Sequence, residues 1–318
     1  MTSDLHKACR RSRLHRKSTG QAIALTPRDL EVFKILNRYR YLRSNFIHAF
    51  VGGNKIALIK RLGVLYHEGY LDRPAQQWQA INARYMPAVY ELGTKATQTL
   101  RANGISVSSV PSRLYQHSIM VCDILASMEL AVRAAPSLRL VPWEEIAGKL
   151  PESTRNRDNP LELPCSISFT FSRSATIHHS TKAVVPDAVF GIEYIPSRSY
   201  RFFALEADRN NEPVFRNDLS QTSYLRKVLQ YREIAKGAYK THWGLPNLLV
   251  LTVTTSSAHM DNILTLVRDL CGEKGASYLL FKTMPSLASL ERAPSPDTYL
   301  LTAPWQRAGH EPFEIHKP

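Results

Sequence analysis

The sequence lacks the patterns that mark several common classes of protein. It has only 4 cysteines in 318 residues, and no two of them form a Cys-x-x-Cys pair, which argues against a zinc site or a disulfide framework. No apolar run approaches the ~18 residues that cross a membrane, and the basic N-terminus has no apolar signal-peptide core. It also contains no glycine-rich phosphate loop and no Gly-x-Ser-x-Gly elbow, which leaves little support for a metabolic enzyme. We therefore expect a cytoplasmic protein.

Acidic residues are scarce in the first third of the chain. Residues 1–110 hold 18 Lys and Arg against 6 Asp and Glu, whereas residues 111–318 hold 23 against 21. Nearly all of the net charge of +14 is therefore concentrated in one region. Such a concentration favours a polyanionic partner, because phosphate neutralisation releases counterions. A generally basic surface is the alternative, since charge alone does not name a partner.

A basic arm at residues 1–20 precedes the first predicted helix. It contains Lys7, Arg10, Arg11, Arg13, Arg16 and Lys17 with the single acid Asp4, and it has no apolar periodicity. This composition predicts a disordered segment that lies along DNA or is simply solvated.

Three helices and a hairpin are predicted after the arm. Thr26 caps the first helix, the second ends at Gly52, and the third begins after Asn54. Strands follow at 69–71 and 88–92, and a further helix runs from about residue 93 to 104. This order resembles the winged helix-turn-helix family over residues 25–105. The resemblance implies binding to duplex DNA. The basic residues expected to contact the DNA are Lys55, Lys60 and Arg61 on the third helix, Arg84 in the loop between the strands, and Arg10, Arg11 and Arg13 in the arm.

Two neighbouring strands of the second region each carry an acid. One segment contains Pro186-Asp187, and the next contains Glu206-Ala207-Asp208. Two strands that point acids into one cleft make a site for a divalent metal, and magnesium is the usual ion that acts on phosphodiesters. The predicted metal ligands are Asp187, Glu206 and Asp208, with Mg²⁺ as the cofactor.

The second region, residues 112–290, has the predicted order helix, three strands, helix, strand, and 291–318 are expected to form a C-terminal tail that is irregular after Trp305. This order resembles the restriction-endonuclease-like superfamily, whose signature is Pro-Asp on one strand and Glu-x-Lys on the next. Asp208 stands here in the place of the lysine. The resemblance implies a catalytic set of Asp187, Glu206 and Asp208, with Lys227 on the following helix as a replacement cation, or else as a solvated charge. The predicted fold is thus α+β or α/β, with an N-terminal winged helix-turn-helix and a C-terminal mixed sheet flanked by helices.

The two regions together resemble the plasmid replication-relaxation family over roughly residues 25–285. The resemblance implies a DNA-binding protein of plasmid or mobile-element replication, mobilisation or relaxation, which acts beside a relaxase or another replication protein. It leaves open whether the second domain is a magnesium-dependent DNA endonuclease. The alternative is a non-enzymatic transcriptional regulator whose C-terminal domain serves dimerisation or ligand sensing. Winged helices that read palindromes tend to be dimers, so a homodimer is considered, although no heptad pattern indicates one.

Overall fold

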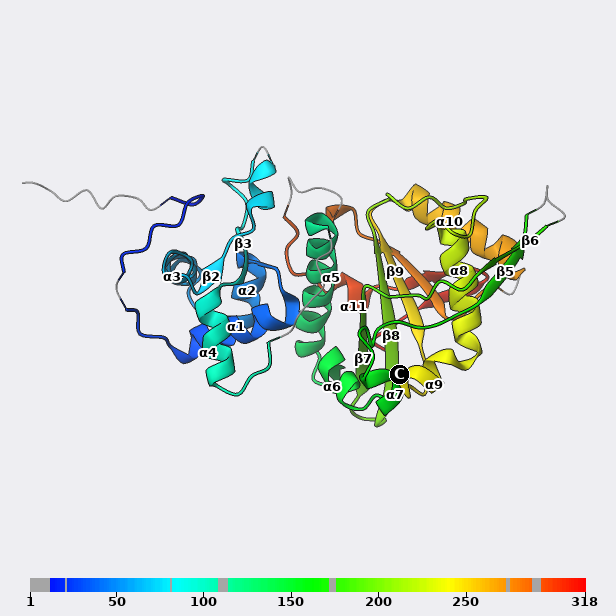
Figure 1. Ribbon diagram of the computed structural model, residues 1–318, viewed down its shortest axis with the longest axis horizontal. Coiled ribbons are helices and arrows are strands. Elements are labelled where there is room, and N and C mark those ends of the chain that lie inside the picture. Colours follow the sequence, from blue (N-terminus) through cyan, green and yellow to red (C-terminus); the bar gives the residue numbers. More distant parts are fainter. Residues whose placement is uncertain are drawn as a thin grey trace, which may run out of the picture. The chain divides into compact units, whose positions relative to one another are not determined.

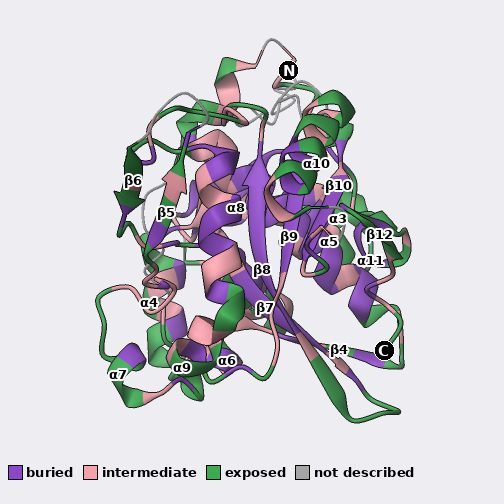
Figure 2. Cartoon of the chain, turned by 90° about the vertical axis from the view of Figure 1, so that its right-hand side faces the viewer, coloured by how far each residue is buried: buried purple, intermediate pink, exposed green. Residues whose placement is uncertain are grey.

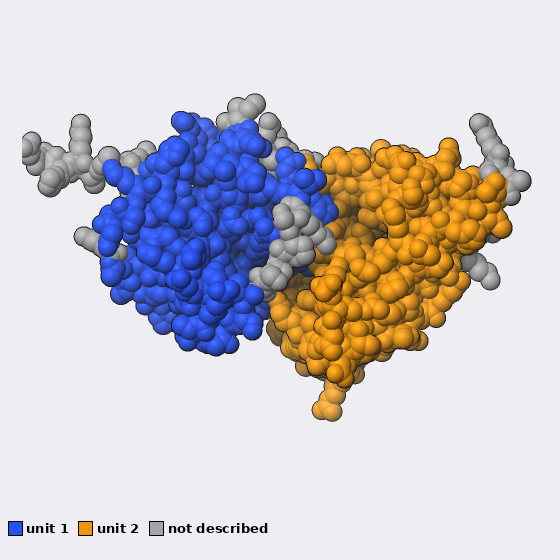
Figure 3. All heavy atoms as spheres, viewed as in Figure 1, with its two compact units in different colours: residues 1–126, 289–296 blue, residues 127–288, 297–318 orange. Residues whose placement is uncertain are grey.

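The computed structural model divides the chain into two compact units. Unit 1 comprises residues 1–126 with 289–296, and unit 2 comprises residues 127–288 with 297–318 (Figure 3). The structure describes residues 12–20, 22–80, 82–107, 114–171, 176–272, 275–287 and 293–318. The division falls within helix α5 (Tyr115–Arg133), a segment for which the sequence pattern predicts one long helix over 114–134.

Unit 1 begins with three short helices (Figure 1). They are α1 (Pro27–Tyr39), α2 (Ser44–Val51) and α3 (Lys55–His67). Thr26 and Asp29 form a capping box at the start of α1, in which each side chain accepts the other residue's backbone N–H. Asn54 caps α3, and Gly52 ends α2 with a φ of 65°, a conformation that glycine adopts without steric cost.

A small sheet and a fourth helix complete the N-terminal part of unit 1. The strands β1 (Leu42–Arg43), β3 (Val89–Leu92) and β2 (Leu71–Asp72) pair antiparallel in that spatial order. The 3₁₀ helix η1 (Ala75–Gln79) lies between β2 and β3, and α4 (Thr94–Ala102) follows β3. Three helices followed by a β2–β3 hairpin match the predicted order of elements.

Unit 2 is built on a seven-stranded mixed sheet, so the predicted fold class is confirmed at this level. The spatial order is β12-β11-β10-β9-β8-β7-β4. The strands are β4 (Leu138–Val141), β7 (Ala188–Tyr194), β8 (Ser199–Asp208), β9 (Leu249–Thr254), β10 (Leu279–Thr283), β11 (Trp305–Arg307) and β12 (His310–Phe313). β4, β7 and β8 pair antiparallel, while β8, β9 and β10 pair parallel.

Helices cover the sheet of unit 2. α8 (Tyr224–Glu233) and α10 (Ser257–Cys271) lie side by side on one face (Figure 2). The sequence pattern predicts a helix over 219–236, but α8 starts at Tyr224, because Ser223 caps it by accepting from the N–H of Arg226. A π-helical turn (Ile234–Ala238) with Gly237 at φ 134° links α8 to α9 (Tyr239–Trp243). The remaining short elements of unit 2 are η3 (Pro285–Leu287) and α11 (Tyr299–Thr302).

Several predicted segments of unit 2 were wrong in detail. The sequence pattern predicts a strand over 138–143 and a loop over 150–164. Trp143 instead begins α6 (Trp143–Gly148), and the loop segment contains α7 (Glu152–Arg155). β5 (Ile167–Thr170) forms as predicted, but it pairs with β6 (Ile177–Ser180) in a separate two-stranded sheet. The tail after Trp305, expected to be irregular, supplies β11 and β12 at one edge of the large sheet, where β11 pairs with β10.

No helix in the described part of the chain is long and apolar enough to span a membrane.

Candidate functional site

Asp187 and Glu206 lie next to one another at one end of the paired strands β7 and β8. Ala188, the first residue of β7, is opposite Leu205 in the antiparallel register, so Asp187 and Glu206 each lie one residue beyond this pair. The N–H of Asp187 donates to the Leu205 carbonyl at 2.9 Å, and the N–H of Ala207 donates to Asp187 Oδ2 at 2.8 Å. Backbone hydrogen bonds therefore position the Asp187 carboxylate against β8.

Both oxygens of the Glu206 carboxylate accept hydrogen bonds from side chains of α8. The Tyr231 hydroxyl donates to Oε1, and Lys227 Nζ lies 2.9 Å from Oε2. Glu206 is only 5% exposed, so these two donors replace the water that the carboxylate would otherwise bind. Lys227 and Tyr231 are four residues apart on α8, a spacing that places both side chains on one face of the helix.

Lys227 also pairs with Glu212, a residue that the sequence did not single out. Its Nζ lies 2.6 Å from Glu212 Oε2, so one ammonium group bridges two carboxylates. The other oxygen, Glu212 Oε1, is buried and has no hydrogen-bond partner in the described structure. We refer to Asp187, Glu206, Glu212, Lys227 and Tyr231 together as the carboxylate–lysine cluster.

The charges of the cluster shift the pKa values of its members. Burial raises the pKa of Glu206, Lys227 opposes that shift, and the neighbouring charge of Asp187 adds to it. Burial would lower the pKa of Lys227, but Glu206 and Glu212 outweigh it and raise that pKa above its ordinary value. Lys227 is therefore a permanent cation at neutral pH.

Asp208, the third predicted metal ligand, is engaged with a different partner. His259 Nε2 lies 2.7 Å from Asp208 Oδ2, and the Asn211 N–H donates to Asp208 Oδ1 at 3.2 Å. His259 is in the first turn of α10, whose cap Ser256 accepts from the His259 N–H at 3.3 Å. No sequence motif pointed to His259, because its partner lies 51 residues away along the chain.

The ring of Tyr224 connects the two groups of charges. Lys227 Nζ lies 5.5 Å from its centroid, and the His259 ring packs edge-on at 5.6 Å. Burial raises the pKa of Tyr224 well above its usual value, and the carboxylates of Asp208 and Glu212 reinforce the shift. Tyr224 is therefore uncharged at neutral pH, and its ring contacts both the Asp208–His259 pair and the carboxylate–lysine cluster.

The predicted magnesium ion requires oxygen ligands that are close together. Among the residues that the structure describes, no three His, Cys, Asp or Glu side chains gather closely enough to hold a metal by themselves. Mg²⁺ commonly binds through one or two carboxylates, with water and phosphate oxygens as its remaining ligands. The adjacent pair of Asp187 and Glu206 fits that requirement, and the unpartnered Glu212 Oε1 provides a further acceptor for a bound water.

The predicted DNA-binding residues of α3 differ in their exposure and in the bonds that their side chains make within the protein. Lys55 and Lys60 are exposed, whereas Arg61 lies 2.7 Å from Asp29 Oδ2 and also donates to the Ala24 carbonyl. Arg61 thereby holds the start of α1 against α3. Arg84 is exposed in the loop before β3.

The described part of the basic arm contacts the protein itself. The Arg13 guanidinium donates to the carbonyls of Arg84 and Met86, and Arg16 donates to the carbonyls of Tyr66 and Leu71. Further along, Ser18 and Thr19 donate to the carboxylate of Glu68. Residues 12–20, expected to be disordered, are thus held along unit 1, while Arg10 and Arg11 lie outside the described residues.

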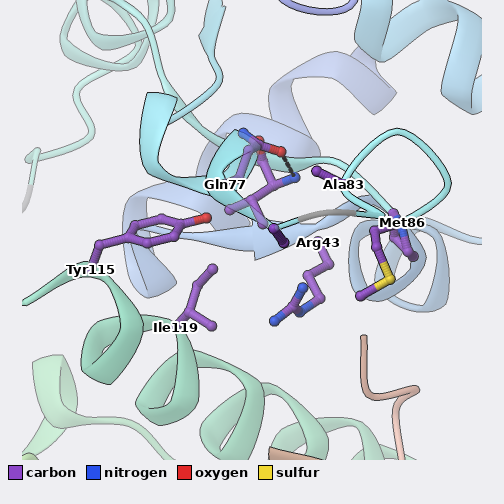
Figure 4. Close-up of a pocket in the computed structure, with 9 residues that line it drawn as sticks. Arg43, Gln77, Ala83, Met86, Tyr115 and Ile119 are labelled. Carbon is purple, nitrogen blue, oxygen red and sulfur yellow. Dashed lines mark hydrogen bonds between the residues drawn. The ribbon is translucent and has the colours of Figure 1, made fainter. Parts of the chain in front are cut away.

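Unit 1 also contains a small cavity of about 20 Å³ (Figure 4). It is lined by Arg43, Gln77, Ala80, Ala83, Met86, Pro87, Val89, Tyr115 and Ile119. Its volume suits one water molecule, whereas small-molecule sites take roughly 300 Å³ or more.

Arg43 Nε lies 3.1 Å from Asp123 Oδ2, and burial raises the pKa of Asp123 to about 6 despite the opposing charge of Arg43.

Comparison with known families gives one match. The model of the family described as replication-relaxation matches residues 33–248. No curated protein and no solved structure matches the chain significantly.

Proposed function

The chain belongs to the replication-relaxation family, and we propose that it is a DNA-binding protein of plasmid or mobile-element replication, mobilisation or relaxation. In this proposal unit 1 is a winged helix-turn-helix that holds duplex DNA, and unit 2 is a diverged restriction-endonuclease-like domain. A relaxase or another replication protein is the expected partner. The exposed Lys55 and Lys60 on α3, together with the hairpin of β2 and β3, support the role of unit 1.

The order of elements supports the assignment of unit 2. α5, β4, β7, β8, α8 and β9 follow one another as helix, three strands, helix and strand, with α6, α7, β5 and β6 inserted before β7. The observation that carries the proposal is the ion pair between Lys227 and Glu206, beside Asp187. Asp208 stands at the strand position where the motif has a lysine. Lys227 on α8 provides a positive charge in place of that lysine.

The residues of the carboxylate–lysine cluster have distinct roles in this proposal. Asp187 and Glu206 would hold Mg²⁺, and the bound ion would supply Lewis-acid chemistry for the hydrolysis of a phosphodiester. Lys227 supplies a fixed positive charge where negative charge develops on a phosphodiester. Tyr231 keeps Glu206 oriented by donating to its Oε1. The Asp208–His259 pair supports the end of β8 and is the least connected to this chemistry.

Metal binding tests the nuclease-like part of the proposal. Calorimetry of the full chain with MgCl₂ or MnCl₂ should show binding that Asp187→Ala and Glu206→Ala both abolish. Asp218→Ala is a matched control, because Asp218 is a half-buried acid of the same unit whose side chain accepts hydrogen bonds from nearby Ser220 and Gln221. If neither metal binds at millimolar concentration, the nuclease-like assignment fails. Incubation of supercoiled plasmid with the same variants then reports cutting.

A second candidate function is a non-enzymatic regulator that binds DNA. It is favoured by the full engagement of the acids, since both oxygens of Glu206 and both of Asp208 interact with protein donors. This candidate predicts duplex binding without metal binding or strand cleavage, and it gives unit 2 a role in dimerisation. Mapping the DNA fragments that the chain binds across its source replicon, with and without magnesium, separates the two candidates.

A further inference from the structure

Helix α3 presents an apolar stripe to solvent on its N-terminal half. Ile56 is 67% exposed and Ile59 is 45% exposed, while Leu58, Leu62 and Leu65 on the opposite side are buried. Residues three apart on a helix are neighbours on its surface, so the two isoleucines form one patch. A single exposed isoleucine is ordinary in a folded protein, but two adjacent ones on a cationic helix call for a reason.

Gly63 lies on the same face of α3 as the two isoleucines and leaves the helix backbone uncovered by a side chain. It lies seven residues after Ile56, about two turns further along the same face. A Cβ built on Gly63 would meet only Arg73 Nη2, at 3.9 Å, so the chain itself does not need a glycine there. Glycine inside a helix costs about 1 kcal/mol relative to alanine. The missing side chain leaves room for another molecule to approach the backbone of α3 closely.

The charges around the stripe select the kind of molecule. α3 has no acidic residue, and the exposed Lys55 and Lys60 flank the two isoleucines. The N-terminus of a helix also carries a partial positive charge. An apolar protein surface would not interact favourably with the positive charges of α3. A polyanion that also carries apolar groups would interact with both the charges and the two exposed isoleucines. Duplex DNA has that combination, because thymine presents a methyl group in the major groove.

We propose that Ile56 and Ile59 contact the C5 methyl groups of thymines in the major groove, while Lys60 pairs with a flanking phosphate. This inference rests on the proposed function, since it requires unit 1 to hold duplex DNA. Gly63 allows the groove wall to approach the middle of α3. The chain consequently prefers sites with thymine at the two contacted positions.

Uracil substitution tests the inference directly, because uracil lacks only the methyl group of thymine. The full chain is first used to select a preferred site from a random-sequence DNA pool. Affinities are then compared for that duplex and for duplexes with uracil in place of individual thymines. We expect a loss of about fourfold at each contacted thymine, from the transfer free energy of one apolar carbon. Uracil placed outside the selected site should have no effect.

Variants identify the side chains that sense the methyl group. Ile56→Ala combined with Ile59→Ala should bind thymine and uracil duplexes equally, whereas Lys60→Ala should weaken both by the same factor. Ile195→Ala is a matched control, because Ile195 is a 47% exposed isoleucine of unit 2. A double variant that still distinguishes thymine from uracil would overturn the inference, as would a wild-type chain that binds both duplexes alike. If the wild-type chain binds no duplex, the proposed function fails together with the inference.

Discussion

Lys227 and Glu206 form a buried ion pair in which the ammonium nitrogen lies 2.9 Å from the carboxylate oxygen. The Lys227 side chain is 21% exposed and that of Glu206 is 6% exposed. The same ammonium bridges to Glu212, so one lysine compensates two carboxylates that water scarcely reaches. Removing it leaves uncompensated negative charge inside unit 2, and a buried charge without its partner is strongly destabilising.

Lys227→Met should therefore lower the free energy of unfolding by about 3 kcal/mol at neutral pH. The loss should be smaller near pH 5, because the raised pKa of Glu206 lets it become protonated and lose its need for a counter-charge. Urea denaturation at the two pH values measures both effects. Lys236→Met is the control, since Lys236 is 68% exposed and its pair with Glu233 contributes little.

A second substitution separates the ion pair from simple packing. Glu206→Gln combined with Lys227→Met should be less destabilising than the sum of the single changes, because it removes one of the two stranded charges. Strict additivity in this double-mutant cycle would contradict a direct interaction between the two side chains.

Local signals in the sequence predicted most of the helix boundaries of unit 1. Thr26, Asn54 and Gly52 mark helix ends because each satisfies backbone groups within a few residues of itself. β11 and β12 had no such signal. They have three and four residues. β11 depends on pairing with β10, which precedes η3 and α11 in the chain, and β12 depends on pairing with β11. Short strands of that kind are decided by tertiary structure rather than by local propensity.

The candidate site divides along the same line. The Pro-Asp and Glu-x-Asp motifs pointed to Asp187 and Glu206, and Lys227 is the predicted replacement cation on the following helix, so these residues could be selected without coordinates. Glu212 and His259 could not. Glu212 lies in an irregular segment after β8, and His259 reaches Asp208 at the end of β8 only because α10 packs on the neighbouring strand β9. No periodicity links residues that meet through packing.

The basic residues of α3 should fall into two classes when they are mutated. Lys55→Ala and Lys60→Ala should each weaken duplex binding and lower the salt-dependence slope by about one unit, as loss of a phosphate contact does. Arg61→Ala should instead lower the stability of unit 1 by roughly 2 kcal/mol, because Asp29 is buried and loses its charged partner. Fluorescence anisotropy across salt concentrations and thermal unfolding measure the two effects. If Arg61→Ala lowered the slope and left stability unchanged, the assigned role of this residue would be wrong.

Asp123 should make the stability of unit 1 depend on pH. Burial raises the pKa of its carboxyl to about 6 in the folded chain, from an ordinary value of 3.8. A raised folded pKa stabilises the protonated form, so this contribution is fully present below about pH 4 and is lost as the pH rises through 6. Asp123→Asn should flatten this part of the stability profile, measured by thermal unfolding between about pH 4 and pH 7. An Asp123→Asn profile parallel to that of the wild type would rule out this titration.

His259 should matter for stability through the hydrogen bond to Asp208. The Asp208 side chain is 4% exposed, and His259→Ala would remove the donor at 2.7 Å from its Oδ2, leaving the Asn211 N–H on the other oxygen. We expect a loss of about 2 kcal/mol in the free energy of unfolding, which is the usual cost of a buried acceptor that loses its donor. His259→Gln should recover part of this loss, because its side-chain amide places an N–H donor about as far from the backbone as the imidazole Nε2. His310→Ala is the control, since His310 is exposed on β12.

Equal stability of the wild type and His259→Ala would show that the Asp208–His259 pair does not hold the end of β8. A metal affinity that fell with His259→Ala while stability stayed constant would instead place His259 in the chemistry of the carboxylate–lysine cluster.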